Sequence, residues 1–551
     1  MENSVWFTRS IVLKSTAFIY FIAFLVSYNQ NVGLIGKDSL MPFPDFLDNY
    51  SKSSPNQSPY EKFKSLPTLF WFIGTEDSQL NLISLLGLIL SLITLSGLIT
   101  HSLIFLILWL LYHSIVNVGQ RWFSFGWESQ VLETGFLCIF LAPTTSISCY
   151  EKRSPPNKFI LWLFLWLEFR IMLGAGMIKI RGDNCWKDLT CMNYHYETQP
   201  NPMPTAYYMH QSPEFVHKIE VLGNHAIELG FGWLVILPNR MCKLVGGSFL
   251  VLFQVILIIS GNLSFLNWLT IVPTLAAFDD KIYSYFHGKK KVETVENLII
   301  IEEKTKKMLS LAKIWKFVNL LISLGFVGVI LYLSKPVMEN VLSSKQIMNT
   351  SFDNFRIVNT YGAFGSVGQK RYEVIIEVSF KEFPEKDSDW HEIVFKCKPG
   401  PINRRPCIIT PYHYRLDWVI WFAGFEPHDF RYHPWILHLL AKLLVGHQNT
   451  LDLLDYSNNL LYYPNGQQEN MKLPTFIRAN MYEYRFTPIN KKLGSKEWEV
   501  GSWWIRRKKS NYVPMMNLKN EGLKDAMRQM GWRMPKVLKE QSKKNKAKGE
   551  L

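Results

Sequence analysis

The sequence predicts a polytopic α-helical membrane bundle followed by a β-rich domain, and three observations lead to this fold class. Runs such as NLISLLGLILSLITLSGLIT can cross a hydrocarbon core of ~30 Å, which takes about 20 residues as a helix. The chain has 60 Lys and Arg against 45 Asp and Glu, and the basic residues lie in short loops between apolar runs and in the C-terminal tail. After about residue 350, polar residues alternate with β-branched or aromatic ones, which indicates strands.

Hydropathy gives about nine candidate spans. The fourth and sixth are weak, because each carries carboxylates, which a bilayer disfavours. The nine are centred on residues 11–27, 81–98, 101–118, 129–147, 159–178, 220–238, 244–260, 262–278 and 315–334.

A cytosolic N-terminus places three basic loops in the cytosol, as the positive-inside rule requires. Membrane topology thus accounts for the positive loops, and we expect contact with membrane lipid and no nucleic-acid partner. The loops hold Lys152, Arg153 and Lys158, then Arg240 and Lys243, then Lys281, Lys289, Lys290 and Lys291.

The same orientation divides the chain into five parts. The second is rich in Ser, Pro and Asn, and its run DNYSKSSPNQSPYEK is expected to be irregular or disordered. The parts are a first span in 1–28, a lumenal loop in 29–80, a multi-span domain in 81–334 with a lumenal loop 179–219 and a cytosolic, partly helical loop 279–314, a β-rich lumenal domain in 350–515, and a basic disordered tail in 516–551.

Within the β-rich domain, four segments have strand-like alternation: RYEVIIEVSF, HEIVFKCKPG, FIRANMYEYRF and WEVGSWWIRR. Between them, PWILHLLAKLLVG has helical spacing and is apolar enough for a buried or membrane-surface helix.

Two kinds of motif agree with a lumenal placement. The glycosylation sequons at Asn56 and Asn349 both fall in lumenal parts, where glycosylation takes place. The chain also ends in Lys-Gly-Glu-Leu, which differs by one residue from an endoplasmic reticulum retrieval signal. A disordered basic tail that ends in Glu-Leu by chance is the alternative.

Two pairs of cysteines also lie in lumenal parts, where oxidation is permitted. Cys185 and Cys191 enclose a short loop, so they form either a local disulfide or, as the alternative, a thiol-exchange pair. Cys397 and Cys407 flank KPGPINRRP, and there we expect a structural disulfide.

A polar stripe marks the sixth candidate span. At about 100° per residue, His217, Glu220, Asn224 and Glu228 share one side of a helix, with His225 at its edge. Such a stripe must face protein or water, and Glu133, Glu168 and Arg170 of neighbouring spans are candidate partners. A structural ion-paired network and a metal or proton-handling site are the two interpretations. No HExxH motif, phosphate-binding loop or nucleophile elbow is present, so we expect no catalytic residue, metal or cofactor.

Two long segments carry a family resemblance. DNCWKDLTCMNYHYETQPNPMPTAYYMHQSPEFVHKIEVLGNHAIEL closely resembles the signature of the lipase maturation factors, and FKCKPGPINRRPCIITPYHYRLDWVIWFAGF resembles the centre of their lumenal C-terminal domain. The likeness covers roughly residues 60–515. The family is usually drawn with five spans, which keeps the C-terminus in the lumen as nine do.

The resemblance implies an endoplasmic reticulum membrane protein that helps dimeric secreted lipases of the lipoprotein lipase type, and other lumenal secretory proteins, to fold and mature. Its C-terminal domain is then expected to bind the client. The alternative is a membrane-embedded enzyme or thiol-redox factor that uses the polar stripe and the lumenal cysteines, because the helical part also resembles vitamin K-dependent carboxylases. The candidate client-binding residues are Arg404, Arg405, Tyr412, Tyr414, Arg415, Asp417 and Trp418.

Overall fold

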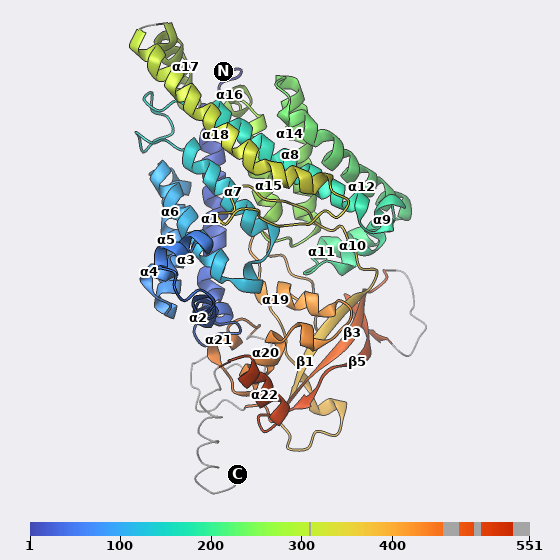
Figure 1. Cartoon of the computed structure of the whole chain (residues 1–551). Helices are drawn as coiled ribbons and strands as arrows, with labels where there is room; N and C mark the ends of the chain where they lie inside the picture. Colours follow the sequence, from blue (N-terminus) through green and yellow to red (C-terminus); the bar gives the residue numbers. More distant parts are fainter. Residues whose placement is uncertain (308–309, 456–472, 490–497, 533–551) are drawn as a thin grey trace.

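The computed structural model of the chain describes residues 1–307, 310–455, 473–489 and 498–532. Helices from the first two thirds of the chain form a bundle, and a β-sheet with its own helices is attached to one end of it (Figure 1). The N-terminus lies at the opposite end of the bundle (Figure 1). The expected order, helical membrane part and then β-rich part, is confirmed.

Six helices among the described residues are long and apolar enough to cross a membrane. One of them, Glu214–Ile236, is continuous through a π-turn. The six are α1 (Trp6–Ile35), α5 (Asp77–Ser96), α8 (Lys158–Arg181), α12 (Glu214–Ala226) with η2 (Ile227–Phe231) and α13 (Gly232–Ile236), α14 (Arg240–Ser260), and α18 (Ser310–Leu342), whose apolar part is Leu320–Leu342.

Three shorter helices occupy the other predicted spans: α6 (Ser102–Val118), α7 (Gly126–Leu141) and α15 (Leu266–Thr274), which continues as η3 (Leu275–Ala277). Each of the nine predicted segments is therefore helical, but only six reach span length. Helix α7 has 16 residues. It buries the carboxylates of Glu128 and Glu133, which form ion pairs with Arg415 and Arg170. The number of membrane crossings stays a prediction.

The loop 29–80 contains α2 (Phe43–Ser53), α3 (Pro59–Ser65) and α4 (Phe70–Ile73). The run DNYSKSSPNQSPYEK, expected to be irregular, lies mostly in α2 and α3, so that prediction is wrong for those residues. Ser58 and Glu61 form a capping box at the start of α3, and Pro59 occupies the first helical position. These local signals outweigh the polar composition of the segment.

Further short helices join the spans. The loop after α8 folds into α9 (Asn184–Lys187), α10 (Met192–Thr198) and α11 (Pro204–His210), beside the C-terminal domain. The loop after α15 contains α16 (Asp280–Ser284) and the expected helix α17 (Lys289–Lys307).

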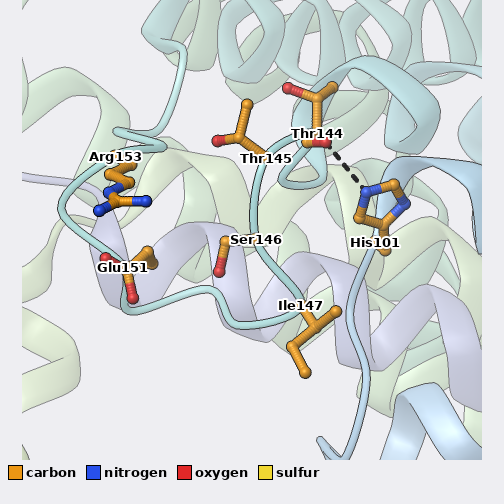
Figure 2. Close-up of a pocket in the computed structure, with 7 residues that line it drawn as sticks. All are labelled: His101, Thr144, Thr145, Ser146, Ile147, Glu151 and Arg153. Carbon is orange, nitrogen blue, oxygen red and sulfur yellow. Dashed lines mark hydrogen bonds between the residues drawn. The ribbon is translucent and has the colours of Figure 1, made fainter.

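The loops with the predicted cytosolic charges gather at the N-terminal end of the bundle. Helix α1 has no cap of its own, and Asp280 accepts hydrogen bonds from the N–H groups of Trp6 and Phe7, each 2.8 Å long. A hollow of 660 Å³ lies at this end, and most of its lining residues are polar and belong to the loop before α8 (Figure 2). His101, which also lines it, has its Nε2 atom 3.0 Å from the carbonyl oxygen of Thr144. These loops therefore share one side of the molecule, and their cytosolic placement stays a prediction.

The described strands form one antiparallel sheet in the order β2-β1-β3-β5-β4. The predictions for RYEVIIEVSF and FIRANMYEYRF are confirmed by β1 and β3. The strands are β1 (Arg371–Ser379), β2 (His391–Glu392), β3 (Phe476–Phe486), β4 (Glu499–Val500) and β5 (Trp504–Met516).

HEIVFKCKPG is a strand only at its first two residues, so that prediction is wrong for the rest. Asp417 accepts hydrogen bonds from the N–H groups of Cys397 and Lys398 at 2.6 and 2.9 Å. These two donors are therefore not available to pair with a neighbouring strand. The segment instead leads into the disulfide-closed loop to Cys407.

The helix η5 (Ile420–Gly424), which follows α19 (Arg415–Val419), packs on β1, and α20 (Trp435–Leu444) packs on β3. Helix α21 (Gln448–Leu451) packs on α20 and α1. The predicted buried helix is confirmed by α20. Within the tail expected to be disordered, Glu521–Gln529 form α22, whose Leu523 and Met527 are buried, so the prediction is wrong for these residues. Residues 533–551, with the Lys-Gly-Glu-Leu end, lie outside the described residues.

Candidate functional site

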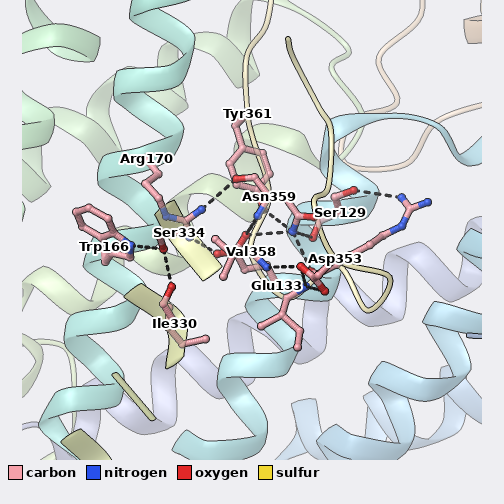
Figure 3. Close-up of polar contacts among 12 residues, drawn as sticks. Ser129, Glu133, Trp166, Arg170, Ile330, Ser334, Asp353, Val358, Asn359 and Tyr361 are labelled. Carbon is pink, nitrogen blue, oxygen red and sulfur yellow. Dashed lines mark hydrogen bonds and ion pairs between the residues drawn. The ribbon is translucent and has the colours of Figure 1, made fainter. Parts of the chain in front are cut away.

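Buried charges fix the C-terminal part on the bundle. Arg170 of α8 pairs with Glu133 of α7 and donates to the carbonyl oxygen of Asn359 at 3.0 Å (Figure 3). Glu133 also accepts from the Asn359 N–H at 3.0 Å and from the Tyr361 hydroxyl at 2.7 Å. Glu133 and Arg170 therefore bind each other and residues 359 and 361, and they do not serve the polar stripe as expected.

A second buried pair joins α7 to α19. Arg415 Nη1 lies 2.6 Å from a Glu128 carboxylate oxygen, and both side chains are 0% exposed. The same nitrogen donates to the Trp122 carbonyl oxygen at 2.7 Å, and the guanidinium carbon lies 3.5 Å from the Phe123 ring centroid. A buried pair of this kind is costly to break by removing one partner.

A cavity of 560 Å³ lies between the bundle and the C-terminal part. Most of its walls are aromatic or aliphatic, and the charged lining residues of α8 and α12, together with His195 of α10, form what we call its polar end. The residues that line the cavity include Trp127 of α7, Lys179 of α8, His195 of α10, Glu220 and Asn224 of α12, Gln254 of α14, and Phe364 and Trp421 of the C-terminal part.

The predicted polar stripe forms part of this polar end. Lys179 pairs with Glu228 and donates to the Asn224 side-chain oxygen at 3.0 Å, and Asn224 donates to Glu228 at 2.9 Å. Lys179 is the functional residue that the sequence reasoning missed. A lysine in the last turn of a predicted span is typical of a helix end at the membrane interface. The sequence pattern therefore did not indicate that the Lys179 side chain lies inside the protein.

The two histidines of the stripe have other partners. His217 Nδ1 lies 3.0 Å from a Glu220 oxygen, and His225 Nε2 lies 3.1 Å from the Trp186 carbonyl oxygen. Glu168, the third expected partner, is buried elsewhere in α8 and is absent from the cavity wall. Of the stripe, therefore, Asn224 and Glu228 bind Lys179, whereas His217, Glu220 and His225 make separate contacts.

Both predicted disulfides are formed. Cys185–Cys191 closes the turn that carries Trp186, a cavity-lining residue, and its Cα atoms are 4.7 Å apart. Cys397–Cys407 spans 5.5 Å between Cα atoms in the C-terminal domain. Among the described residues, no group of three His, Cys, Asp or Glu side chains could hold a metal ion.

Loop residues beside the cavity are strongly desolvated. Burial lowers the pKa of His195 to about 4, so its imidazole is neutral at neutral pH. Burial raises the pKa of Glu197 to about 7, although its carboxylate accepts from the Phe486 N–H at 3.1 Å. His210, 3.4 Å from Glu197, also has its pKa lowered by burial, to about 4.

The structure divides the seven candidate client-binding residues. Arg405 is exposed, whereas Arg404 is half-buried and pairs with Asp455 at 2.8 Å. Tyr412 and Tyr414 are half-buried, and Tyr412 accepts a hydrogen bond from Gln30 of α1 at 2.9 Å.

Three of the candidates are buried, and this corrects the prediction for them. Arg415 pairs with Glu128, Asp417 binds backbone N–H groups, and the Trp418 ring lies 5.0 Å from that of Trp127. They hold the fold together and are not available to a client. Both predicted glycosylation residues, Asn56 and Asn349, are exposed.

Comparisons with known proteins cover nearly the whole chain. The family model described as the lipase maturation factor transmembrane domain matches residues 7–285, and the one described as the lipase maturation factor C-terminal domain matches residues 357–514. The chain belongs to the lipase maturation factor family. The predicted resemblance is confirmed, and with its apolar helices the chain is a multi-pass membrane protein.

Relatives in this family match in both parts. The chain is 42% identical to lipase maturation factor 1 of Homo sapiens and 45% identical to that of Mus musculus, in each case over 97% of this chain and 91% of the relative. It is 29% identical to lipase maturation factor 2 of Xenopus laevis, over 95% of this chain and 84% of the relative. No solved structure matches the chain.

Proposed function

We propose that this chain is an endoplasmic reticulum membrane factor that assists the folding, dimer assembly and maturation of secreted lipases of the lipoprotein lipase type. The observation that carries this proposal is the 42–45% identity to lipase maturation factor 1 over 97% of the chain, which includes both the bundle and the C-terminal domain. Other secretory proteins of the lumen are further clients in this proposal.

The arrangement of the charges supports a lumenal C-terminal domain. The basic loops lie with the N-terminus at one end of the bundle, where Lys281 pairs with Glu2 at 2.6 Å and Arg9 binds the Ser154 carbonyl oxygen at 2.7 Å. The sheet lies at the other end (Figure 1). With the basic end in the cytosol, the sheet and both disulfides lie in the oxidising lumen.

A client surface is proposed on the C-terminal domain. Arg405 is exposed, and nearby Ile408 and Val500 are 61% and 55% exposed. Their two segments are joined by a hydrogen bond of 3.2 Å from the Trp503 N–H to the Ile402 carbonyl oxygen. A basic and apolar surface on a rigid support suits the exposed apolar segments of a client that has not finished folding.

Lipase maturation in cells tests the proposal. The chain is expressed with a lipoprotein-lipase-type enzyme in cells that lack their own lipase maturation factors, with lipase maturation factor 1 of Homo sapiens as the positive control. The proposal predicts that the secreted lipase gains activity per unit mass. Expression of the chain at the level of the control without any gain in lipase activity would refute it.

A membrane-embedded enzyme is the second candidate, because the stripe and the cavity are the kind of site where perturbed groups gather. Glu220→Gln and His225→Ala separate the two candidates. If the chain acts as a folding factor through its C-terminal domain, both variants mature the lipase normally when expressed at the wild-type level. If the stripe is catalytic, both lose this activity.

A further inference from the structure

The cavity lies where α12 and α14 part. The two helices join through a short turn after α13, and there α14 packs on α13 and η2. Farther along, α12 packs on α10, whereas α14 packs on α11 and α15. The cavity occupies the space between them, lined by Gly223 and Asn224 on α12 and by Gln254 and Leu257 on α14.

The outer sides of these two helices are apolar and exposed. Phe215 and Leu222 of α12 are 64% and 53% exposed, and Leu252 of α14 is 54% exposed. Ile256 belongs to both surfaces, because it lines the cavity and is also 45% exposed. In a multi-pass membrane protein such a surface faces acyl chains, so the cavity wall continues into the lipid-facing surface.

The gap is open at Gly223. A Cβ atom placed on this residue would meet nothing within 4 Å, although the residue lines the cavity. A hydrocarbon chain therefore has a lateral path from the bilayer into the cavity. The amides of Asn224 and Gln254 border this path together with the apolar Leu257, so a hydroxyl-bearing head group can pass with the chain.

At the polar end, the charged side chains already have partners. Lys179 is paired with Glu228, and Glu220 faces His217. A ligand with an ionised head group would lose its hydration without gaining a free counter-charge. The polar end is thus suited to an uncharged head group that forms hydrogen bonds.

His195 provides a free polar group at this end. Its side chain is 8% exposed and lines the cavity, and its ring nitrogens make no hydrogen bond to any other residue that the structure describes. Two aromatic rings contact it, with the Phe364 centroid at 4.9 Å and the Tyr196 centroid at 5.9 Å. A buried imidazole without a partner is ready to bind a ligand hydroxyl.

The remaining walls are aromatic and aliphatic, with Trp127, Met172, Phe253 and Trp421 among them. The volume of 560 Å³ is within the range of about 300–1,000 Å³ for sites that take one small molecule. We propose that this cavity binds a single-chain lipid with an uncharged, hydroxyl-bearing head group, which enters from the bilayer between α12 and α14. The head lies at His195 and the chain along the aromatic wall.

Photolabelling of the full-length chain in phosphatidylcholine nanodiscs tests this site. The probe is a monoacylglycerol with a diazirine in its acyl chain and a terminal alkyne, and labelled peptides are identified by mass spectrometry. The proposal predicts labels on cavity-lining residues of α10, α12 or α14. Labels confined to the lipid-facing surface of helices remote from the cavity, such as α5, would overturn it.

Two matched variants examine the entry. Gly223→Phe fills the gap between α12 and α14, whereas Gly230→Phe places the same ring in open space at a residue that does not line the cavity. Gly223→Phe should lose the cavity labels and Gly230→Phe should keep them. Equal labelling of the two variants would overturn lateral entry, and size-exclusion profiles show whether both are folded.

The head group is examined by competition. His195→Phe keeps an aromatic ring but removes the hydrogen-bonding nitrogens, so unlabelled monoacylglycerol should compete about two- to tenfold more weakly, the range for one lost hydrogen bond. A fatty acid of the same chain length should compete poorly with the probe on the wild-type chain. A fatty acid that competes as well as the monoacylglycerol, or unchanged competition in His195→Phe, would overturn the proposed head-group site.

Discussion

Arg415→Met should loosen the C-terminal domain from the bundle. The change removes the cation from a pair in which both side chains are 0% exposed, and it leaves the Glu128 carboxylate buried without its partner. Removal of one partner of a buried ion pair costs about 3–5 kcal/mol of folding free energy. The same change leaves the Trp122 carbonyl oxygen without the guanidinium donor at 2.7 Å, which adds to the loss.

Equilibrium unfolding of the purified chain in detergent micelles, followed by tryptophan fluorescence, measures this loss. Arg431→Met is the matched control, because Arg431 pairs with Asp429 but its side chain is 80% exposed, and it should cost far less stability than Arg415→Met. The double variant Arg415→Met with Glu128→Gln should recover part of the loss. The neutral amide leaves no buried charge, and its oxygen still accepts from Trp127 Nε1, 2.9 Å from the carboxylate in the wild-type chain.

The two arginine variants decide whether the reasoning holds. If Arg415→Met loses no more stability than Arg431→Met, the pair does not fix the domain. If the double variant is as unstable as the sum of its single changes, the charges are not coupled, and the argument from a buried pair is refuted.

Three further predictions follow from other parts of the structure. Because burial raises the pKa of Glu197 from 4.5 to about 7, its contribution to stability is fully present below pH 4.5 and is lost as the pH rises through 7. Glu197→Gln cannot ionise, so wild type should lose about 3 kcal/mol more than this variant between pH 4 and pH 8 in unfolding experiments; parallel pH profiles would contradict this. Lys179→Met leaves Glu228 without its cation and should cost about 3–5 kcal/mol, whereas Lys218→Met, which breaks an exposed pair with Glu214, should cost far less; similar losses would refute the buried network. Asn56→Gln and Asn349→Gln should each remove one glycan and increase electrophoretic mobility in a glycosylation-competent cell, and wild-type mobility in both would refute the lumenal placement.

Local patterns in the sequence predicted the elements well. The apolar runs became helices at all nine places, and alternation located β1 and β3, because burial periodicity acts over neighbouring residues. Cys185 with Cys191 and Cys397 with Cys407 were predictable for the same reason, since each pair is close in the sequence. Helix α3 was missed although Ser58, Pro59 and Glu61 carry a readable capping signal, which the polar composition of the segment obscured.

Contacts between distant parts of the chain could not be predicted from the sequence. Arg415 and Glu128 are 287 residues apart, and the sequence around either residue does not indicate that it pairs with the other. An arginine among aromatic residues is as typical of a binding surface as of a buried pair, and only the folded structure distinguishes them. Lys179 was missed for a related reason, because its partners Asn224 and Glu228 lie on another helix.

Photocrosslinking to a client tests the central claim most directly. A photoreactive amino acid is placed at Arg405, Ile408 or Val500 on the C-terminal domain. It is also placed at Phe286, which is 80% exposed and precedes His287, whose ring stacks on that of Phe7 at 4.2 Å. Each variant is irradiated in cells that express a lipoprotein-lipase-type enzyme. We expect lipase adducts from the C-terminal positions and none from Phe286. Adducts from Phe286 alone, or no adduct from any C-terminal position in a chain that still matures the lipase, would contradict client binding by the C-terminal domain.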